Sequence, residues 1–507
     1  MNAEPNDDDT WPKGPWRPWS DQFDWKLHKK FPKFFKPAQY YQSLIYHQGK
    51  DAKYNQQSSI GNCGVSTKAL ISYDFVTVSQ FNSFMNNLEK LGWYDAHRPE
   101  VNSLQWLREW RSNPFGSGSR VILKAVQNGD KKVFAPNSRR LDLPHWCERV
   151  KITAITVNPA LIALRFTFSF RSHYEKDLQH LAQQSYNTEF SVLAKGGWEI
   201  REPRSQKKLS VHNKRKSWKQ DIEDFIRSHL SLELSKNSTS GVPIFEICEL
   251  DNVEPTEEHT GDNPDANLME ILDLNWNRYR AWIYNELEGF VLYPKIDTFS
   301  KQEMQYTVIL ANSVMADKTF TASYGRQLTG QAISEHHSKA LLGLSIDHLL
   351  RHYNSVLVRM RDGLSGTSGL RKSVKNLKNA SIHNRRREDI EAIIGDFSKS
   401  DKLKILRIRS ENLSPLEPTY FDKDISMKGF LTQNILARIK VLKDLDKRYE
   451  KQLLSRSHLV SAWASLSLSR AVLIVGLLSV LLTIFTGWED TYSKVWLRII
   501  NYFEVRQ

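Results

Sequence analysis

The stretch AVLIVGLLSVLLTIFTGW, residues 471–488, decides how this chain is built. Its 18 residues carry no charge. A helix of that length measures about 27 Å, close to the roughly 30 Å hydrocarbon layer of a bilayer. Trp488 at one end suits the headgroup level, and Arg470 at the other end can snorkel to it. Core helices of soluble proteins are usually amphipathic, whereas this segment is apolar all round. We therefore predict a single transmembrane helix over 471–488.

The flanks of the span bear on its orientation. Lys and Arg lie on both sides, so their charges do not settle it. The first residues, MNAEPNDDDTWPKG, are acidic and lack the apolar core of a secretory signal. Only the 19 residues 489–507 would need to cross, so we expect residues 1–470 in the cytosol. The tail contains VWLRIINYFEV, residues 495–505, which predicts either a short amphipathic helix on the far membrane surface or a disordered end.

Composition excludes several classes of protein. The chain has 507 residues, 40% of them apolar and 11% aromatic, which is too much for a largely disordered chain. Three cysteines without a CxxC pair exclude a disulfide framework and argue against structural zinc. The net charge of +14 favours attraction to polyanions but says nothing about fold.

Changes in composition along the chain predict an α+β fold in six segments. An N-terminal domain with an antiparallel sheet and helices comes first, and a C-terminal helical region leads into the single transmembrane helix. The segments are 1–40, an aromatic and basic arm; 41–250, the α+β cytosolic domain; 251–267, an acidic linker; 268–468, a mostly helical domain and stalk; 471–488, the transmembrane helix; and 489–507, a short tail. In the arm, aromatic residues alternate with cations. Such a segment can stack on bases, sit at a membrane surface or pack along its own domain.

Periodicity predicts the elements of the α+β domain. Ser79–Leu91 is an amphipathic helix with Ser79 as N-cap and Gly92 at its end. Asn128-Gly129 predicts a hairpin between Val121–Val126 and Lys132–Phe134. The runs Val150–Val157 and Ala160–Phe170 predict two further strands, the second of them half-buried because its apolar residues alternate.

Further along, we expect helices at Val101–Arg111, Trp218–Leu230, Ile333–Met360, Val374–Phe397 and Leu431–Leu454, strands at Val242–Leu250 and Tyr306–Leu310, and a helix around Trp276, Tyr279, Ile283 and Leu287.

Two neighbouring segments carry opposite charge. Residues 201–220 hold eight Lys or Arg and one Glu, and residues 246–277 hold ten acidic residues and no Lys or Arg. The two segments could pair with each other, the basic run could face an anionic surface, or it could be a solvated loop.

Cys63, in NQQSSIGNCGVSTKALISY, is the first candidate for chemistry. A cysteine at a helix N-terminus has a lowered pKa and a reactive thiolate. With Gln57 six residues before it, and Gly61, the stretch resembles the nucleophile motif of papain-like cysteine peptidases. That resemblance implies an oxyanion-hole role for Gln57, with His145 and Asn158 as the nearest base and orienting residue. Ile60 and Gly64 depart from the family pattern, and the alternative is a buried, inert cysteine.

Two other patterns match known sites only in part. His348 and His352 stand four residues apart on a predicted helix, as in HExxH zinc sites, but Leu349 replaces the general-base glutamate. The run GLSGTSGLRKS, 363–373, lacks the P-loop spacing because Arg371 precedes Lys372. The sequence therefore predicts no catalytic, cofactor-binding or metal site and no cofactor, and it favours a protein that is not an enzyme.

Three functions remain compatible with these features. The first is a C-terminally anchored cytosolic sensor, scaffold or effector. The second is an oligomeric ion-conducting protein: the layout resembles that of CorA-type magnesium transporters, without their Gly-Met-Asn signature or second span. The third is a membrane-tethered hydrolase that uses Cys63. Expected partners are the lipid bilayer and a second copy of the chain, with nucleic acid or anionic lipid as further possibilities.

A second copy is expected because an apolar stripe runs along the stalk. The stripe must be buried, either in a coiled coil between subunits or against helices 333–360 and 374–397 of the same chain. Its residues are Ile435, Ile439, Leu442, Tyr449 and Leu453.

Overall fold

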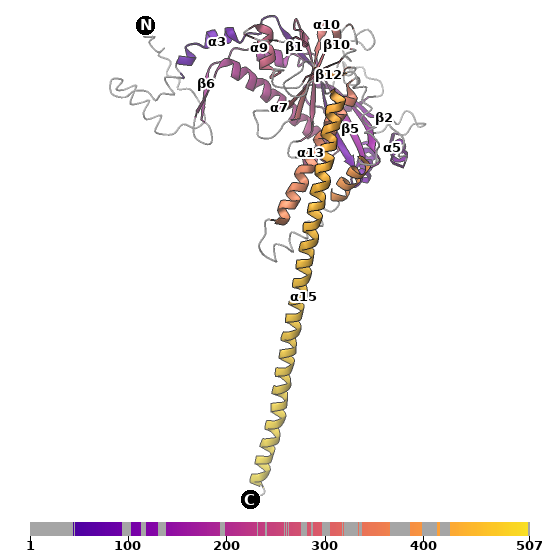
Figure 1. Ribbon diagram of the computed structural model, residues 1–507, viewed down its shortest axis with the longest axis vertical. Coiled ribbons are helices and arrows are strands. Elements are labelled where there is room, and N and C mark those ends of the chain that lie inside the picture. Colours follow the sequence, from indigo (N-terminus) through magenta and orange to yellow (C-terminus); the bar gives the residue numbers. More distant parts are fainter. Residues whose placement is uncertain are drawn as a thin grey trace, which may run out of the picture. The chain divides into compact units, whose positions relative to one another are not determined.

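The computed structural model gives a chain of mixed helices and strands (Figure 1). With short internal gaps, it describes residues 44–93, 103–112, 118–129, 138–192, 198–274, 281–296, 305–318, 333–365, 386–397, 413–415 and 426–504. The arm 1–40, most of the glycine-containing loop 363–373 and the second half of the hairpin predicted at Lys132–Phe134 therefore lie outside the described residues.

The chain divides into two compact units. The sheet unit comprises residues 1–352 and 389–439, and the stalk unit comprises residues 353–388 and 440–507. Two long helices take part in both units: α13 (Ser338–Ser365) and α15 (Met427–Glu504). In Figure 1, α15 can be followed as one unbroken helix to the C-terminal end.

One ten-stranded sheet organises the sheet unit. Its strand order is β12 (Leu413–Pro415), β9 (Trp282–Tyr284), β10 (Leu287–Ile296), β11 (Gln305–Asn312), β8 (Ile244–Asp251), β1 (Gly64–Thr77), β5 (Leu161–Phe170), β4 (Cys147–Asn158), β2 (Ser119–Gln127) and β3 (Arg139–Leu141). A separate pair joins β6 (Glu189–Val192) to β7 (Trp198–Arg201).

The sheet is mixed rather than purely antiparallel. Most described pairings are antiparallel, as predicted, but β11 runs parallel to β8 and β3 runs parallel to β2. The central strands β1 and β8 are antiparallel neighbours. On either side of them the order runs backwards along the chain: β5, β4, β2 on one side and β11, β10, β9 on the other. A long helix follows each set, α7 (Pro203–His229) after the first and α13 after the second. The two halves of the sheet thus share a similar connectivity.

The helices α7 and α13 meet opposite faces of the sheet. Successive side chains of a strand point to opposite faces. Glu246 of β8 binds Arg215 of α7, whereas the neighbouring Phe245 packs against Tyr73, whose hydroxyl donates to the Ser338 carbonyl of α13. The central strands are therefore covered on both faces. This explains why β5, predicted to be half-buried, has Arg165 only 6% exposed on its polar side.

Aromatic rings fill the layer between α7 and the sheet. Trp146 stacks on Phe170 with ring centroids 4.7 Å apart, Trp218 meets Phe170 edge-on at 4.9 Å, and Phe225 meets Phe168 edge-on at 5.6 Å. Offset and edge-to-face arrangements of this kind add specificity to apolar burial.

Several local predictions are confirmed. The strands predicted at Val150–Val157 and Ala160–Phe170 are β4 and β5, which form a hairpin with Thr156 opposite Ile162. The helices α4 (Phe81–Leu91) and α5 (Ser103–Ser112) and the strands β8 and β11 lie where periodicity placed them. Gly92 ends α4 with φ of +60°, in the left-handed region that glycine adopts without strain.

Other local predictions are wrong. The chain around Ile283 and Leu287 is extended, in β9 and β10, because both strands complete the sheet beside β11. The N-cap of α4 is Gln80, since the Ser79 hydroxyl instead donates to Asp389. The segment 251–267, predicted as an acidic linker, has Val253 and Asn267 buried and ends within α9 (Pro264–Ile271), which Asn263 caps at its N-terminus.

Candidate functional site

Cys63 lies in a setting unlike that of the peptidase nucleophile. It precedes the strand β1, so it does not begin a helix of its own as the peptidase nucleophile does. The side chain is buried, and its Sγ lies 2.9 Å from Oδ1 of Asp265. Burial first, and then the Asp265 carboxylate, raise the pKa of the Cys63 thiol to about 12. At neutral pH the sulfur is therefore a protonated donor rather than a nucleophile. The expectation of a helix after Cys63 was wrong because the apolar run is β-branched and forms the central strand.

The two histidines of α13 are both buried, and each faces a different partner. Nε2 of His348 donates to the Gly241 carbonyl at 2.9 Å. Burial lowers the pKa of His348 to about 3, so the ring is neutral. His352 lies 3.5 Å from Oε1 of Glu233. Among the described residues, no group of three or more His, Cys, Asp and Glu side chains is placed to hold a metal ion.

The basic run 201–220 forms most of α7, and it pairs with the acidic segment after β8. Arg204 lies 3.1 Å from Glu270, Lys208 lies 2.6 Å from Asp273, and Arg215 reaches Glu246. Of the three interpretations of these charges, pairing within the chain is confirmed for these residues. Much of the positive charge of α7 is thus compensated by carboxylates of the same chain.

The pair of Arg215 and Glu246 is the most deeply buried ion pair among the described residues. Nε of Arg215 lies 2.7 Å from Oε2 of Glu246, with side chains 1% and 0% exposed. The Arg215 guanidinium also donates to the Leu272 carbonyl at 2.6 Å, and Cys248 donates its thiol hydrogen to Glu246. Burial is the largest influence and raises the pKa of Glu246, but the Arg215 charge and the hydrogen bonds from Cys248, Arg215 and Tyr306 together outweigh it and hold that pKa below its usual range. This cluster joins α7, β8 and the end of α9 through charge-assisted hydrogen bonds.

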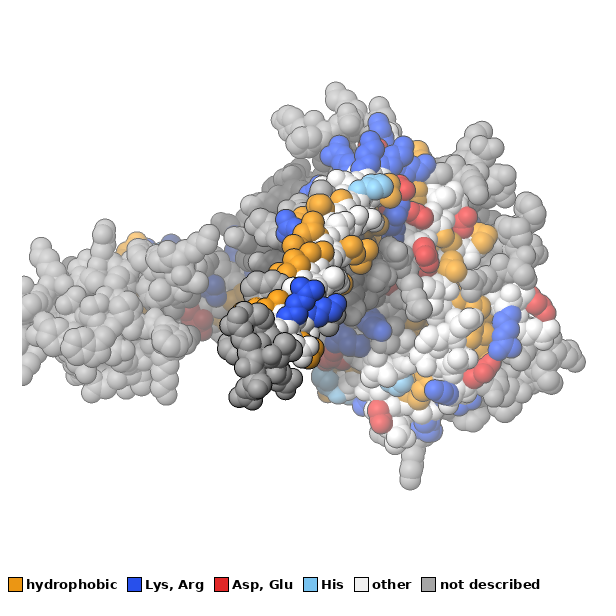
Figure 2. All heavy atoms as spheres, turned by 90° about the horizontal axis from the view of Figure 1, so that it is seen from below, with side chains coloured by type: hydrophobic (Ala, Val, Ile, Leu, Met, Phe, Trp, Pro, Cys, Tyr) orange, Lys and Arg blue, Asp and Glu red, His pale blue; other side chains and the backbone are white. Residues whose placement is uncertain are grey.

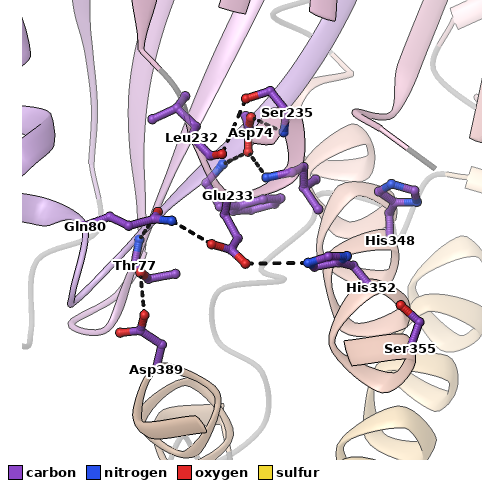
Figure 3. Close-up of polar contacts among 12 residues, drawn as sticks. Asp74, Thr77, Gln80, Leu232, Glu233, Ser235, His348, His352, Ser355 and Asp389 are labelled. Atoms are coloured by element: carbon purple, nitrogen blue, oxygen red, sulfur yellow. Dashed lines mark hydrogen bonds and ion pairs between the residues drawn. The ribbon is translucent and has the colours of Figure 1, made fainter. Parts of the chain in front are cut away.

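A second buried carboxylate, Asp74 of β1, holds the short helix α8 (Glu233–Asn237) against the sheet (Figure 3). Its oxygens accept from the backbone N–H groups of Leu234 at 2.7 Å and Ser235 at 2.9 Å. Burial raises the pKa of Asp74 to about 7, even though these hydrogen bonds favour the ionised form. Next to it, Glu233 accepts from the Gln80 amide at 2.6 Å and faces His352, so α8 links β1, the turn before α4, and α13.

Asp389 attaches the returning part of the chain to the sheet. Its Oδ2 accepts from the hydroxyls of Thr77 at 2.8 Å and Ser79 at 2.5 Å, and its Oδ1 accepts from the Ser79 backbone N–H (Figure 3). Asp396 accepts from the backbone N–H of Ala160 at 3.1 Å. Residues more than 230 positions apart in the sequence are thereby joined.

These buried charges were not identified from the sequence. A signal was present: Asp74 stands within the apolar strand ALISYDFVT, and Glu246 within IFEICEL. A charge inside a strand that is covered on both faces must have a buried partner, but the strand alone does not say which residue that is.

The first turns of α15 are buried in the sheet unit and form what we call the root (Met427–Ile439). Met427, Leu431 and Ile435 are fully buried, and Trp282 of β9 packs on Phe430 with ring centroids 5.1 Å apart. Arg438 forms an ion pair with Asp347 of α13, and the same Asp347 carboxylate also pairs with Arg351.

The apolar stripe predicted along the stalk continues from the root, and four of its five residues are buried within the chain, whereas Leu453 is only partly covered. Ile435, Ile439, Leu442 and Tyr449 are each at most 5% exposed. Within the stalk unit, Arg387 pairs with Asp446 at 2.7 Å. Of the two interpretations of the stripe, packing within the chain is the one the structure supports at these positions.

Beyond Tyr449, α15 changes character. It contains one stretch that is long and apolar enough to cross a membrane, and no other described part of the chain buries this stretch. Figure 2 shows orange side chains along the face of this helix that is turned to the viewer. The exposed side chains include Leu473 at 63%, Leu478 at 56%, Leu482 at 68% and Phe485 at 69%. In water, such a surface would be strongly unfavourable.

Comparisons with known proteins identify no relative. No protein-family model matches the chain, and neither a curated protein nor a solved structure matches it significantly.

Proposed function

We propose that this chain is a C-terminally membrane-anchored sensor, scaffold or effector whose sheet unit lies in the cytosol. The observation that carries the proposal is the continuity of α15. One helix runs from a root buried in the sheet unit to an uncovered apolar segment at 471–488. A span that is rooted in a folded core can transmit a change in that core, such as a ligand-induced shift, to the membrane.

The cytosolic orientation has support from the cysteines. Cys63, Cys147 and Cys248 are all free thiols, and all are buried. Unpaired cysteines are typical of a reducing compartment.

Self-association through the helical stalk belongs to the proposal. Ile435, Ile439, Leu442 and Tyr449 of the stalk stripe are covered within the chain, so contacts between copies would form along the exposed apolar residues of α15, which include Leu436, Val441 and Leu454. An ion-conducting assembly requires such contacts, and conductance measured in a planar bilayer separates it from an anchored sensor or scaffold. The hydrolase alternative has less support, since the pKa of Cys63 leaves little thiolate at neutral pH.

Carbonate extraction of membranes tests the anchor. The full chain is expected in the membrane pellet, and a chain truncated after Arg470 in the soluble fraction. Leu478→Arg combined with Leu482→Arg should also release the chain, because each arginine costs about 2.5–3.5 kcal/mol at the centre of a span. Leu478→Ala with Leu482→Ala is the matched control and should stay in the pellet. Recovery of the truncated chain as an integral membrane protein would contradict the proposal.

Orientation is tested with a membrane-impermeant maleimide and single introduced cysteines. Ser457→Cys should react in intact cells only after the membrane is permeabilised. A label on Ser457→Cys from outside intact cells would reverse the orientation.

A further inference from the structure

The last part of α15 carries uncovered apolar side chains beyond the proposed span. The helix continues through Glu504, and several large side chains in this part are more than 40% exposed. They are Tyr492 at 61%, Val495 at 48%, Trp496 at 58% and Ile499 at 43%. If the helix extended straight into water beyond the membrane, these side chains would remain solvated, which apolar surface disfavours.

These side chains share one face of the helix. The steps from Tyr492 to Val495, Trp496 and Ile499 are three, one and three residues, so the four side chains form one stripe at 3.6 residues per turn. Lys494 and Arg498, four residues apart, lie on the other side. Leu497 is also exposed and apolar, but it lies away from the stripe. The segment is thus amphipathic, with Lys494 and Arg498 on its polar side; residues 489–504 also contain the acidic residues Glu489, Asp490 and Glu504.

We propose that residues 489–504 lie along the lipid headgroups on the far side of the span, with the stripe of Tyr492, Val495, Trp496 and Ile499 turned toward the acyl chains. Tyr and Trp suit this depth because each joins an apolar ring to a polar group. Lys494 and Arg498 then face the anionic phospholipid headgroups. The inference rests on the proposed function, because it takes residues 471–488 as the span.

Two features favour a lipid surface over a second copy of the chain as the occupant of this face. The segment follows the apolar span directly, so the bilayer surface is its nearest apolar phase. Gly487, at the junction, allows the helix to turn, because glycine is the weakest helix former apart from proline.

Site-directed spin labelling of the full chain in vesicles of phosphatidylcholine and anionic phosphatidylglycerol tests the inference. The three native cysteines are buried, so a single introduced cysteine can be labelled selectively. Val495→Cys and Ile499→Cys sample the apolar stripe, and Lys494→Cys and Arg498→Cys are the matched controls on the polar face. Nitroxides at 495 and 499 should collide several-fold more with oxygen, which enters the acyl region, than with a water-soluble nickel chelate. Nitroxides at 494 and 498 should show the reverse preference.

A label at Val480→Cys, within the span, separates this inference from the proposed function. If 480 is accessible to oxygen but 495 and 499 meet the nickel chelate as freely as 494 does, the surface location is wrong and the span stands. If 480 also meets the nickel chelate, the anchor itself is wrong. Spin–spin broadening at 495 and 499 with little access to either reagent would identify a second copy as the occupant and would also overturn the inference.

Discussion

Arg215 of α7 and Glu246 of β8 form an ion pair with Nε and Oε2 2.7 Å apart, and both side chains are almost completely removed from solvent. Because water is excluded, the Arg215 charge is compensated by Glu246 and the Glu246 charge by Arg215, together with the hydrogen bonds that surround the pair. The pair therefore ties the basic helix α7 to the central strands in one specific register.

We predict that Arg215→Met lowers the free energy of unfolding by about 3–5 kcal/mol, because it leaves the Glu246 carboxylate buried without its counter-charge. The double variant Arg215→Met with Glu246→Leu should lose much less, since neither charge remains. Denaturant unfolding of the detergent-solubilised chain, followed by circular dichroism, measures both. Equal losses in the single and double variants would show that packing, and not charge, determines the effect.

Replacing buried residues of α15 should destabilise the chain rather than merely separate subunits. Ile435→Ala and Leu442→Ala are each expected to cost about 2–5 kcal/mol through the cavity they leave. Both side chains are fully buried, whereas their helix neighbours Leu436 and Val441 are 51% and 48% exposed. Leu436→Ala and Val441→Ala are therefore controls, expected to change stability by less than about 0.5 kcal/mol. If all four variants keep wild-type stability while an oligomer dissociates, the stripe packs between subunits instead.

Asp74 should make the chain less stable as pH rises from about 4 to about 7. Its pKa of about 7 in the folded chain lies above the ordinary value of 3.8, so in this window the folded state binds the proton that the unfolded state releases. The free energy of unfolding then falls with pH by up to about 1.4 kcal/mol per unit. Asp74→Asn does not titrate, and its unfolding should lack this component of the pH dependence. Identical pH slopes for Asp74→Asn and the wild type would contradict the shift.

His348 should act in the opposite direction. The pKa of His348 is about 3 in the folded chain, against an ordinary value of 6.5. At a pH between these two values, the histidine is neutral in the folded chain and protonated in the unfolded chain. Stability is therefore lost as pH falls from about 6.5 toward 3. His348→Gln keeps a donor for the Gly241 carbonyl but cannot be protonated, so thermal unfolding of this variant should decline less in acid. A decline as steep as that of the wild type would place the acid sensitivity elsewhere.

Cys63 should react slowly with iodoacetamide at about pH 7.5 in the native chain and rapidly after denaturation. The reason is that burial and Asp265 keep the thiol protonated. Mass spectrometry of the peptide that contains Cys63 measures the extent of alkylation over time. Rapid native alkylation, combined with loss of function in Cys63→Ala at normal abundance, would instead favour the hydrolase.

Part of this architecture could be predicted from short stretches of sequence. The apolar run 471–488, the helix closed by Gly92 and the hairpin around Asn158 each depend on residues close together in the chain. Periodicity and turn preference act over these distances, so the local sequence suffices.

Tertiary structure decided the remainder. Leu287 reads as part of a helix, yet it begins β10, because pairing with β11 and β9 outweighs local preference. The stripe at Ile435 and Leu442 required burial, but its spacing could not tell a partner subunit from the same chain. Likewise, Glu246 needed a buried cation, and only the fold brings Arg215 to it. Local sequence determines which surfaces must be covered and which charges must be compensated, whereas packing between distant segments determines what covers and compensates them.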